Sequence, residues 1–571
     1  MTAAGGAEHR RSNAVLGAAI VILAFLLAAW AHRETLLRPY VVNNDSCQHI
    51  YWMQRWQHPE RFAGDLLTLY AHDYQPSGWR AFYRAWSPLI DPLVLSRWLP
   101  LFLFAGCCGL VFRFVAGFAG RFAGTLAAAL FAVSPLFLQK MAGGHPRSFA
   151  MPILLLTLVL LRERRHGWLG VVLGTASLFY PMVFLLAAGT AGLAAVGDLW
   201  RRRSEGPLRS RLRSWAPVAA GILLGCALVV VQYGPGRDPR LGPTASGELM
   251  RTSPEFYARG RQAHLPSPGP AAVLVESLRR ALPDVRTWLP GEARGPMPRL
   301  EAAGLLVLLA LALLLVLRRR LTIPPELIAL LVAAYTLYIT AVVLLSLLYL
   351  PRRYVMYALP FLAVILLALL GAHLVERLSG RRRQVAQVTL LLVVLSFAPG
   401  LDGVGLDDYS AHADLFGFLR TLPDDSLIAP YPYLGDGIPI FTGRTVFLSY
   451  ELSNPYFVTY WQTVTRRLDD FFDAYYAADP RGVSAFCRAY EVDYLVVDRH
   501  YFERAVIDSR RGAYFEPFSS RIREETAERT EFALASPPPA AVVWSSEDDR
   551  TQVISCSAWE RIFGGGQPVS P

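Results

Sequence analysis

Eleven apolar segments constrain this chain of 571 residues more than any other feature of its sequence. A helix needs about 20 mostly apolar residues to cross roughly 30 Å of hydrocarbon. The composition agrees, because 53% of the residues are hydrophobic and only 18% are charged. The chain is therefore predicted to be a polytopic α-helical membrane protein. The expected spans lie near residues 13–31, 97–117, 121–138, 148–162, 167–180, 182–199, 215–233, 301–317, 325–350, 354–375 and 384–400.

One boundary among these spans depends on a proline. The stretch 167–199 is apolar enough to be a single long helix. Proline disfavours helical geometry in the residue before it, so Tyr180-Pro181 predicts a break between two helices.

Arginine clusters between the spans predict the orientation of the chain. Cytoplasmic loops of membrane proteins are enriched in Lys and Arg, and with eleven spans every cluster falls on one side. The N-terminus is then cytoplasmic and the C-terminus lies outside a bacterial cytoplasmic membrane. A cleaved signal peptide ending at Ala29-Trp30-Ala31 is an alternative that leaves residue 32 onward outside as well. The clusters lie at residues 10–11, 162–165, 201–213, 318–320 and 381–383.

The net charge of +11 does not indicate a nucleic-acid partner, because it is unevenly distributed. Residues 401–571 carry 15 Lys and Arg against 26 Asp and Glu, so the basic part of the chain is the apolar part. This distribution is typical of arginines that anchor membrane loops. The expected partners are membrane lipids.

Two domains are predicted. Residues 1–400 form a transmembrane domain with exterior loops at 32–96 and 234–300, the second with a helix near 271–282. Residues 401–571 form an exterior α/β domain with strands in 426–431 and 493–498, helices in 412–422 and 466–479, and a disordered end at 564–571. Cys487 and Cys556 both lie in this exterior domain and can pair, since oxidising compartments allow disulfides.

The first exterior loop holds a dense group of side chains that can act as acids or bases. They are Asp45, His49, Glu60, Asp65, His72 and Asp73. Asp45 and His49 are four residues apart and share one face of a helix. A carboxylate there can take a proton from an incoming hydroxyl, although Asn44 or Asp45 also suits a helix N-cap. The apolar face with Ile50, Trp52, Met53 and Trp56 predicts a helix at the bilayer interface.

Two further exterior positions can bind phosphate. Gly143 and Gly144 permit close approach beside His145 and Arg147, where the alternative is a snorkelling arginine. Arg352 and Arg353 break the orientation pattern by lying outside, where Pro351 and Tyr354 fix them between two apolar spans. The pair suits an anionic lipid head group, and a salt bridge to the acidic tail is the alternative.

Together these residues predict a glycosyl transfer from a lipid-phosphate donor. Such a reaction needs a carboxylate near the acceptor hydroxyl and positive charge on the departing phosphate. Asp45, His49 and Asp65 are the catalytic candidates, and Arg147, Arg352, Arg353, Tyr354 and His145 are the donor-phosphate candidates. Asp45, His49 and Asp65 are also hard ligands of the kind that Mg²⁺ or Mn²⁺ prefers, but we favour acid–base chemistry without a metal.

The chain resembles the GT-C superfamily of integral-membrane glycosyltransferases. The matching features are the long first exterior loop with its early Asp (NNDSCQHIYWMQRW), the interfacial arginines of PRRYVMYALP, and the exterior C-terminal domain. The resemblance is closest to the protein-mannosyltransferase and aminoarabinose-transferase branch. It implies a polyprenyl-phosphate sugar donor, Asp45 as the base, and Arg352 and Arg353 on the donor phosphate with Arg147 as a helper. Ser46 replaces an acidic residue common in the branch, which leaves Asp65 and Asp73 as rival bases.

Three other functions fit parts of the sequence. A lipid or glycan transporter or flippase favours ionisable residues within its spans, and these spans are nearly free of charge. A membrane anchor for an exterior binding domain needs only one span. A glycan ligase or polymerase with a lipid-diphosphate donor is the nearest alternative to the transferase, with a lipid, glycan or protein acceptor in either case.

Overall fold

The computed structural model describes residues 3–204, 207–234, 238–263, 297–318, 320–348, 350–509 and 513–564. The chain forms two compact units. The helical unit comprises residues 1–44, 76–234 and 278–407, and the α/β unit comprises residues 45–75, 235–277 and 408–571. The helix expected near 271–282 lies outside the described residues, as do residues 565–571 of the end expected to be disordered.

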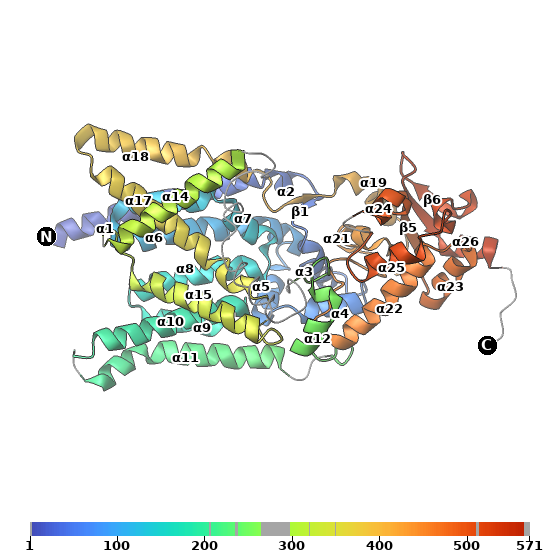
Figure 1. The fold of residues 1–571 in the computed structure, drawn as a ribbon, viewed down its shortest axis with the longest axis horizontal. Coiled ribbons are helices and arrows are strands. Elements are labelled where there is room, and N and C mark those ends of the chain that lie inside the picture. Colours follow the sequence, from blue (N-terminus) through green and yellow to red (C-terminus); the bar gives the residue numbers. More distant parts are fainter. Residues whose placement is uncertain are drawn as a thin grey trace. The chain divides into compact units, whose positions relative to one another are not determined.

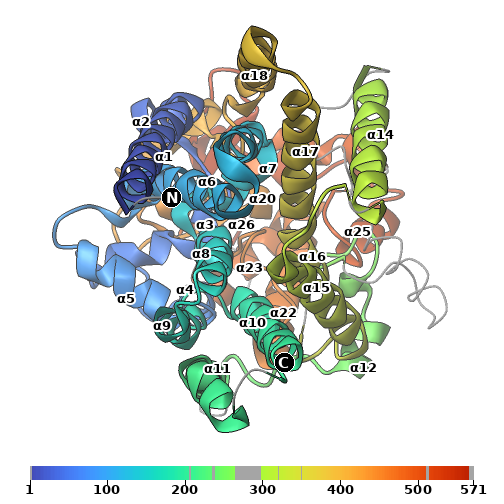
Figure 2. The ribbon, with the colours of Figure 1, turned by 90° about the vertical axis from the view of Figure 1, so that its left-hand side faces the viewer.

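The long helices of the helical unit lie side by side in a bundle (Figures 1 and 2). Helix α6 packs against α1 and α17, and α10 packs against α15. Shorter helices connect or precede them: α2 (Arg33–Leu37), α5 (Ser77–Trp86), α7 (Pro135–Met141) and α16 (Arg352–Val355). The long helices are α1 (Ala3–Ala31), α6 (Pro92–Val133), α10 (Pro181–Arg201), α11 (Leu208–Tyr233), α14 (Met297–Leu317), α15 (Pro325–Val343), α17 (Ala358–Glu376) and α18 (Gly380–Leu395). Two helices of intermediate length, α8 (Ala150–Arg162) and α9 (His166–Ala176), pack with them.

All the expected spans contain helix, and within the described residues seven helices are long and apolar enough to cross a membrane. The chain is a multi-pass membrane protein. The spans expected at 97–117 and 121–138 are largely joined in α6, which bends at Gly120, where φ is 86° and ψ is 170°. Glycine adopts this conformation without the steric cost that a side chain brings. Helix α9 ends at Ala176 and α10 begins at Pro181, which confirms the break predicted at Tyr180-Pro181.

Two of the expected spans are short helices. Helices α8 and α9 have 13 and 11 residues, so they rise about 20 Å and 16 Å and do not reach across the hydrocarbon alone. Glycines bring α9 against α11. A Cβ atom at Gly170 would lie 2.3 Å from the Pro217 carbonyl oxygen, and one at Gly221 would lie 2.2 Å from that of Gly170. Small residues allow this close backbone approach. In a membrane the hydrophobic effect does not drive helices together, so their association depends on such van der Waals packing.

The α/β unit is built around a five-stranded mixed sheet of order β4-β3-β5-β7-β6. Strand β3 is parallel to β4 and β5, whereas β7 is antiparallel to β5 and β6. The apolar runs of β3 and β5 are those predicted from SLIAPY and DYLVVD. The strands are β3 (Leu427–Pro430), β4 (Thr445–Val446), β5 (Tyr494–Asp498), β6 (Val542–Ser545) and β7 (Thr551–Ser555). Two-residue strands β1 (Val41–Val42) and β2 (Asp407–Asp408) lie outside this sheet.

Eleven helices belong to the described part of the α/β unit, and α19 and α22 coincide with the two helices predicted there. Along the chain they are α3 (Ser46–His49), α4 (Leu66–Asp73), α12 (Gly247–Thr252), α19 (Ala413–Leu419), α20 (Pro432–Gly435), α21 (Gly437–Thr442), α22 (Val458–Tyr475), α23 (Pro480–Tyr490), α24 (Arg504–Ile507), α25 (Phe518–Glu525) and α26 (Cys556–Phe563).

Parts of the two long loops expected at residues 32–96 and 234–300 pack into the α/β unit. From the first loop, the Gln54 side-chain amide donates to the Pro439 carbonyl at 3.1 Å, and the rings of Tyr70 and Tyr460 stack at 4.5 Å. From the second, Arg261 forms a salt bridge of 3.0 Å with Glu451, and both side chains are nearly buried. The α/β unit therefore draws on three separate stretches of the chain.

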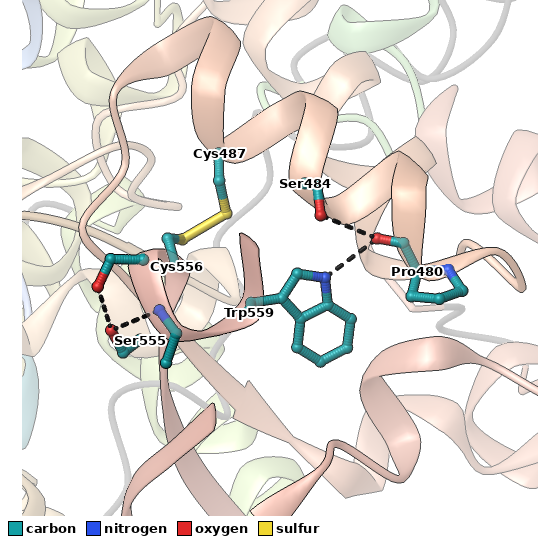
Figure 3. Close-up of a disulfide and its surroundings, with 8 residues drawn as sticks. Pro480, Ser484, Cys487, Ser555, Cys556 and Trp559 are labelled. Atoms are coloured by element: carbon teal, nitrogen blue, oxygen red, sulfur yellow. Dashed lines mark hydrogen bonds between the residues drawn. A yellow bond between two sulfur atoms is a disulfide. The ribbon is translucent and has the colours of Figure 1, made fainter. Parts of the chain in front are cut away.

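Cys487 of α23 and Cys556 of α26 form a disulfide, with a Cα–Cα distance of 6.0 Å (Figure 3). The same two helices are joined by Trp559, whose indole N–H donates to the Pro480 carbonyl at 3.0 Å. Ser555 caps α26 by accepting from the Ala558 N–H. The pairing that the sequence allowed is thus present in the structure.

The disulfide closes a loop of 69 residues, and a chain-entropy argument gives it about 4 kcal/mol of stabilisation. Replacing both cysteines by serine is therefore expected to lower the thermal unfolding midpoint of the α/β unit in detergent. Cys226→Ser is the matched control, because Cys226 is an exposed free cysteine on α11. Equal midpoints for the double variant and the control would contradict a stabilising role.

Candidate active site

A short loop between α7 and α8 presents two of the predicted phosphate-binding residues. It consists of 3-10 helices at Ala142–Gly144 and Pro146–Phe149. Gly143 and Gly144 have positive φ, and a Cβ atom at Gly143 would lie 2.1 Å from Nε2 of His145. The Gly144 carbonyl accepts from the Trp79 indole at 2.9 Å and from the Tyr83 hydroxyl at 3.1 Å. The glycines therefore leave room for the His145 ring while α5 fixes the backbone of the loop.

Asn43 holds this loop from a distant part of the chain. Its side-chain oxygen accepts from Nε2 of His145 at 2.9 Å and from Nη2 of Arg147 at 3.4 Å. Its side-chain NH₂ donates to the Gly405 carbonyl at 2.6 Å. Asn43 and His145 are buried, and Arg147 is half-buried. Asn43 was not predicted as a site residue, and its only sequence signal is its place in the NND run.

The second pair of predicted phosphate ligands lies on α16 and separates into two environments. Nη1 of Arg353 donates to the Tyr180 hydroxyl at 3.0 Å, and Arg353 is half-buried. Arg352 is exposed, whereas the Tyr354 side chain is buried in the helical unit. The structure thus turns one arginine of the pair inward and leaves the other at the surface.

Arg147 and Arg353 approach the same buried tyrosine. Both guanidinium groups interact electrostatically with Tyr357, as does Tyr180. We call Arg147, Arg353, Asn43, His145, Tyr180 and Tyr357 the cationic cluster. Sequence reasoning found Tyr180 only as a helix break and did not find Tyr357 at all.

The cationic cluster lies where three helices begin. Arg147 lies three residues before the start of α8, and Tyr180 immediately precedes α10. Tyr357 immediately precedes α17, and Arg353 lies in the short helix α16 before it. The unsatisfied N–H groups at a helix N-terminus carry a partial positive charge that favours anions. Two guanidinium groups and three helix N-termini therefore give one place in the helical unit a potential suited to phosphate.

Asp45 and His49 belong to the α/β unit and lie on one helical turn, because the Asp45 carbonyl accepts from the His49 N–H at 2.9 Å. Asp45 occupies the N-cap position of α3, but its side chain makes no capping hydrogen bond to this helix. The carboxylate is half-buried. Nδ1 of His49 accepts from the Gln75 side-chain amide at 2.5 Å, and its ring stacks on Tyr74. These contacts orient the imidazole.

The rival carboxylates have local roles in the same unit. Asp65 caps α4 by accepting from the Leu67 N–H at 3.3 Å and the Thr68 N–H at 2.8 Å. Burial nevertheless raises the pKa of Asp65 above its ordinary value, against the lowering effect of these hydrogen bonds. Asp73 lies 2.6 Å from Nδ1 of His72.

The aromatic segment after His49 does not form an interfacial surface. Ile50, Trp52 and Met53 are each no more than 2% exposed, because the segment packs within the α/β unit against α21. The expectation of a bilayer-facing helix here is wrong. Its residues are apolar because they fill a folded core.

Within the described residues, no group of three or more His, Cys, Asp or Glu side chains is placed to hold a metal ion. Asp65 accepts backbone N–H groups, and His49 accepts from Gln75. We therefore derive no step through a metal at these residues.

Neither a protein-family model nor a curated protein matches the sequence of this chain. The structure is similar to the oligosaccharyltransferase of Archaeoglobus fulgidus in complex with Zn and sulfate, with a TM-score of 0.51 and 14% identity over 88% of this chain and 70% of that one. A structure of the same organism's AglB with an inhibitory peptide and a dolichol-phosphate gives 0.50 and 12% identity over 86% and 70%. ArnT from Cupriavidus metallidurans covers 99% of this chain and 100% of that one at 15% identity, but its TM-score of 0.38 supports no conclusion. The first two similarities concern the fold.

The glycine pair provides a test of how the cationic cluster is held. Gly143→Ala places a side chain at φ 82° and within the space of the His145 ring. The left-handed conformation alone costs about 1–2 kcal/mol, so the thermal unfolding midpoint in detergent is expected to fall. Gly106→Ala on α6 is the control, since a Cβ atom there meets nothing within 4 Å. A midpoint for Gly143→Ala equal to that of the control would show that the loop tolerates a side chain.

Proposed function

We propose that this chain, whose fold is that of the GT-C integral-membrane glycosyltransferases, transfers a sugar from a polyprenyl-phosphate donor to an acceptor hydroxyl. The reaction would take place at the outer face of a bacterial cytoplasmic membrane. The observation that carries this proposal is the cationic cluster, which places Arg147 and Arg353 at the N-terminal ends of three apolar helices. An anionic head group attached to a membrane-embedded tail is the ligand whose chemistry fits such a place.

The donor phosphate needs charge neutralisation when the glycosidic bond breaks. As the C1–O bond cleaves, the phosphate oxygen keeps the electron pair and its negative charge grows. Arg147 and Arg353 stabilise this charge with charge-assisted hydrogen bonds, and the Tyr180 hydroxyl orients Arg353. Asn43 orients Arg147 and His145. Arg352 is exposed and meets the head group as it enters, while Tyr354 packs the base of the same turn.

The acceptor hydroxyl needs a base. Its oxygen attacks C1 of the donor sugar while its proton passes to the Asp45 carboxylate. Only Asn44 lies between Asn43 and Asp45 in the chain. Their Cα atoms are therefore at most about 7.6 Å apart, because consecutive Cα atoms are about 3.8 Å apart. Asp45 is thus tied to the cationic cluster by the chain itself. His49, oriented by Gln75, assists on the same helical turn, and Asp65 is the alternative base that remains from the sequence analysis.

Asp45→Asn is expected to lower turnover at least 100-fold while retention of the lipid donor stays unchanged, because the amide cannot accept the proton. The measurement is sugar transfer by the detergent-purified protein from the lipid that co-purifies with it. Asp402→Asn is the matched control, since Asp402 is an exposed aspartate paired with Arg33. Turnover near the wild-type value in Asp45→Asn would move the base to Asp65 or Asp73.

Arg353→Ala is expected to weaken donor retention at least tenfold, because hydrogen bonds to charged groups contribute about 1.5–3 kcal/mol. Arg352→Ala is expected to have a smaller effect, as Arg352 is exposed. Native mass spectrometry of each detergent-purified variant measures the bound lipid and identifies its sugar. Arg320→Ala is the charge-matched control, since Arg320 is exposed. Undiminished retention in Arg353→Ala would refute the phosphate assignment, and a bound lipid diphosphate would favour the glycan ligase.

A further inference from the structure

A large apolar groove lies in the helical unit, and no residue of the cationic cluster lines it. Its volume is about 1260 Å³, and its walls come from α6, α14, α17 and α18. Gly371 of α17 forms its floor, where a Cβ atom would lie 2.8 Å from Leu126 of α6 and 3.0 Å from Leu390 of α18. Leu308 of α14 and Val385 and Val393 of α18 line the groove and are exposed. The groove is therefore accessible from the hydrocarbon that surrounds the bundle.

The groove has two arginines among its otherwise mostly apolar lining. Arg381 and Arg382 belong to the first turn of α18, and both are exposed. The connection from residue 377 to residue 383 contains Arg377, Arg381, Arg382 and Arg383 and no acidic residue. The lining thus combines a long apolar surface with a concentrated positive charge, which is complementary to a lipid that carries an anionic head group.

This charge lies at the opposite end of α17 from the cationic cluster. Helix α17 has 19 residues and therefore rises about 28 Å, close to the thickness of the hydrocarbon core. Arg353 precedes its first residue, and Arg381 follows its last residue by five positions. A phosphate bound by Arg381 and Arg382 is consequently on the other face of the membrane from one bound by Arg353.

Helix α18 needs a partner on this side. Among its described residues Val394 alone is buried, although the helix is long and apolar enough, with the residues that follow it, to cross a membrane. Acyl chains in the groove would contact α18, α17 and α6 together. Such a lipid therefore acts as packing material for α18 as well as a ligand of its arginines.

We propose that this groove is a binding site for an anionic glycerophospholipid, with its acyl chains between α6, α14, α17 and α18 and its phosphate on Arg381 and Arg382. The site differs from the proposed donor site by its membrane face. The inference does not depend on the proposed sugar transfer, because its evidence is the groove and its charge.

The test compares lipid retention by the full-length protein purified in detergent with added phosphatidylglycerol or phosphatidylcholine. Native mass spectrometry counts bound lipid, and the shift of the thermal unfolding midpoint reports its effect on stability. The wild type is expected to retain phosphatidylglycerol and to be stabilised by it more than by phosphatidylcholine. Arg381→Gln with Arg382→Gln is expected to bind phosphatidylglycerol roughly 30-fold more weakly, since each arginine near a membrane surface contributes about 1 kcal/mol.

Two further variants test whether lipid retention depends on the groove itself or only on the total number of exposed arginines. Arg209→Gln with Arg213→Gln removes two exposed arginines from the first turns of α11, which do not line the groove, and is expected to leave retention unchanged. Ala386→Phe fills the groove without changing its charge and is expected to reduce retention. Equal retention in the Arg381/Arg382 variant and the wild type would overturn the proposal, as would equal effects of the two lipids. Loss of a polyprenyl phosphate instead of a phospholipid would overturn it by assigning the groove to the donor.

Discussion

The absence of hydrogen-bond partners in hydrocarbon is the constraint on which the rest of this structure depends. A backbone that crosses a bilayer must satisfy its own N–H and C=O groups, and the helices of the bundle do so along their lengths. Only their ends retain free donors and acceptors. Polar chemistry in the helical unit is therefore confined to places where helices begin or end, and the cationic cluster lies where α8, α10 and α17 begin.

The cationic cluster depends on the close approach of chain segments that are distant in the sequence. Gly143 and Gly144 leave space for the His145 ring and for Tyr83, and one asparagine side chain reaches His145, Arg147 and Gly405. Asn43 therefore connects separate parts of the helical unit by hydrogen bonds. It also lies only two residues before Asp45, the first residue of the α/β unit. In our proposal this arrangement links phosphate binding to the base through two peptide units. The two ends of α17 would then bind lipid phosphates on opposite faces of the membrane.

The amino-acid sequence was sufficient to predict local structure in both units. Apolar runs placed the membrane helices, Tyr180-Pro181 placed a break, and the strands β3 and β5 followed from short apolar stretches. Prediction from the sequence failed where the same residue pattern can arise for two different physical reasons. The aromatic and apolar residues from Ile50 to Met53 suit a membrane surface as well as a folded core, and periodicity does not distinguish the two. Asp45 is an N-cap by position, yet its side chain makes no cap bond.

The sequence by itself determined the membrane class, the helix boundaries near proline and the presence of an α/β domain near the C-terminus, because each follows from local composition and backbone preference. Only the tertiary structure decided which polar residues meet. Arg353 and Tyr180 are 173 positions apart and are joined by a hydrogen bond, while Arg352, adjacent to Arg353, is exposed. A neighbour in sequence can point away and a distant residue can lie in contact, since side-chain direction is set by the helix end and its packing partners.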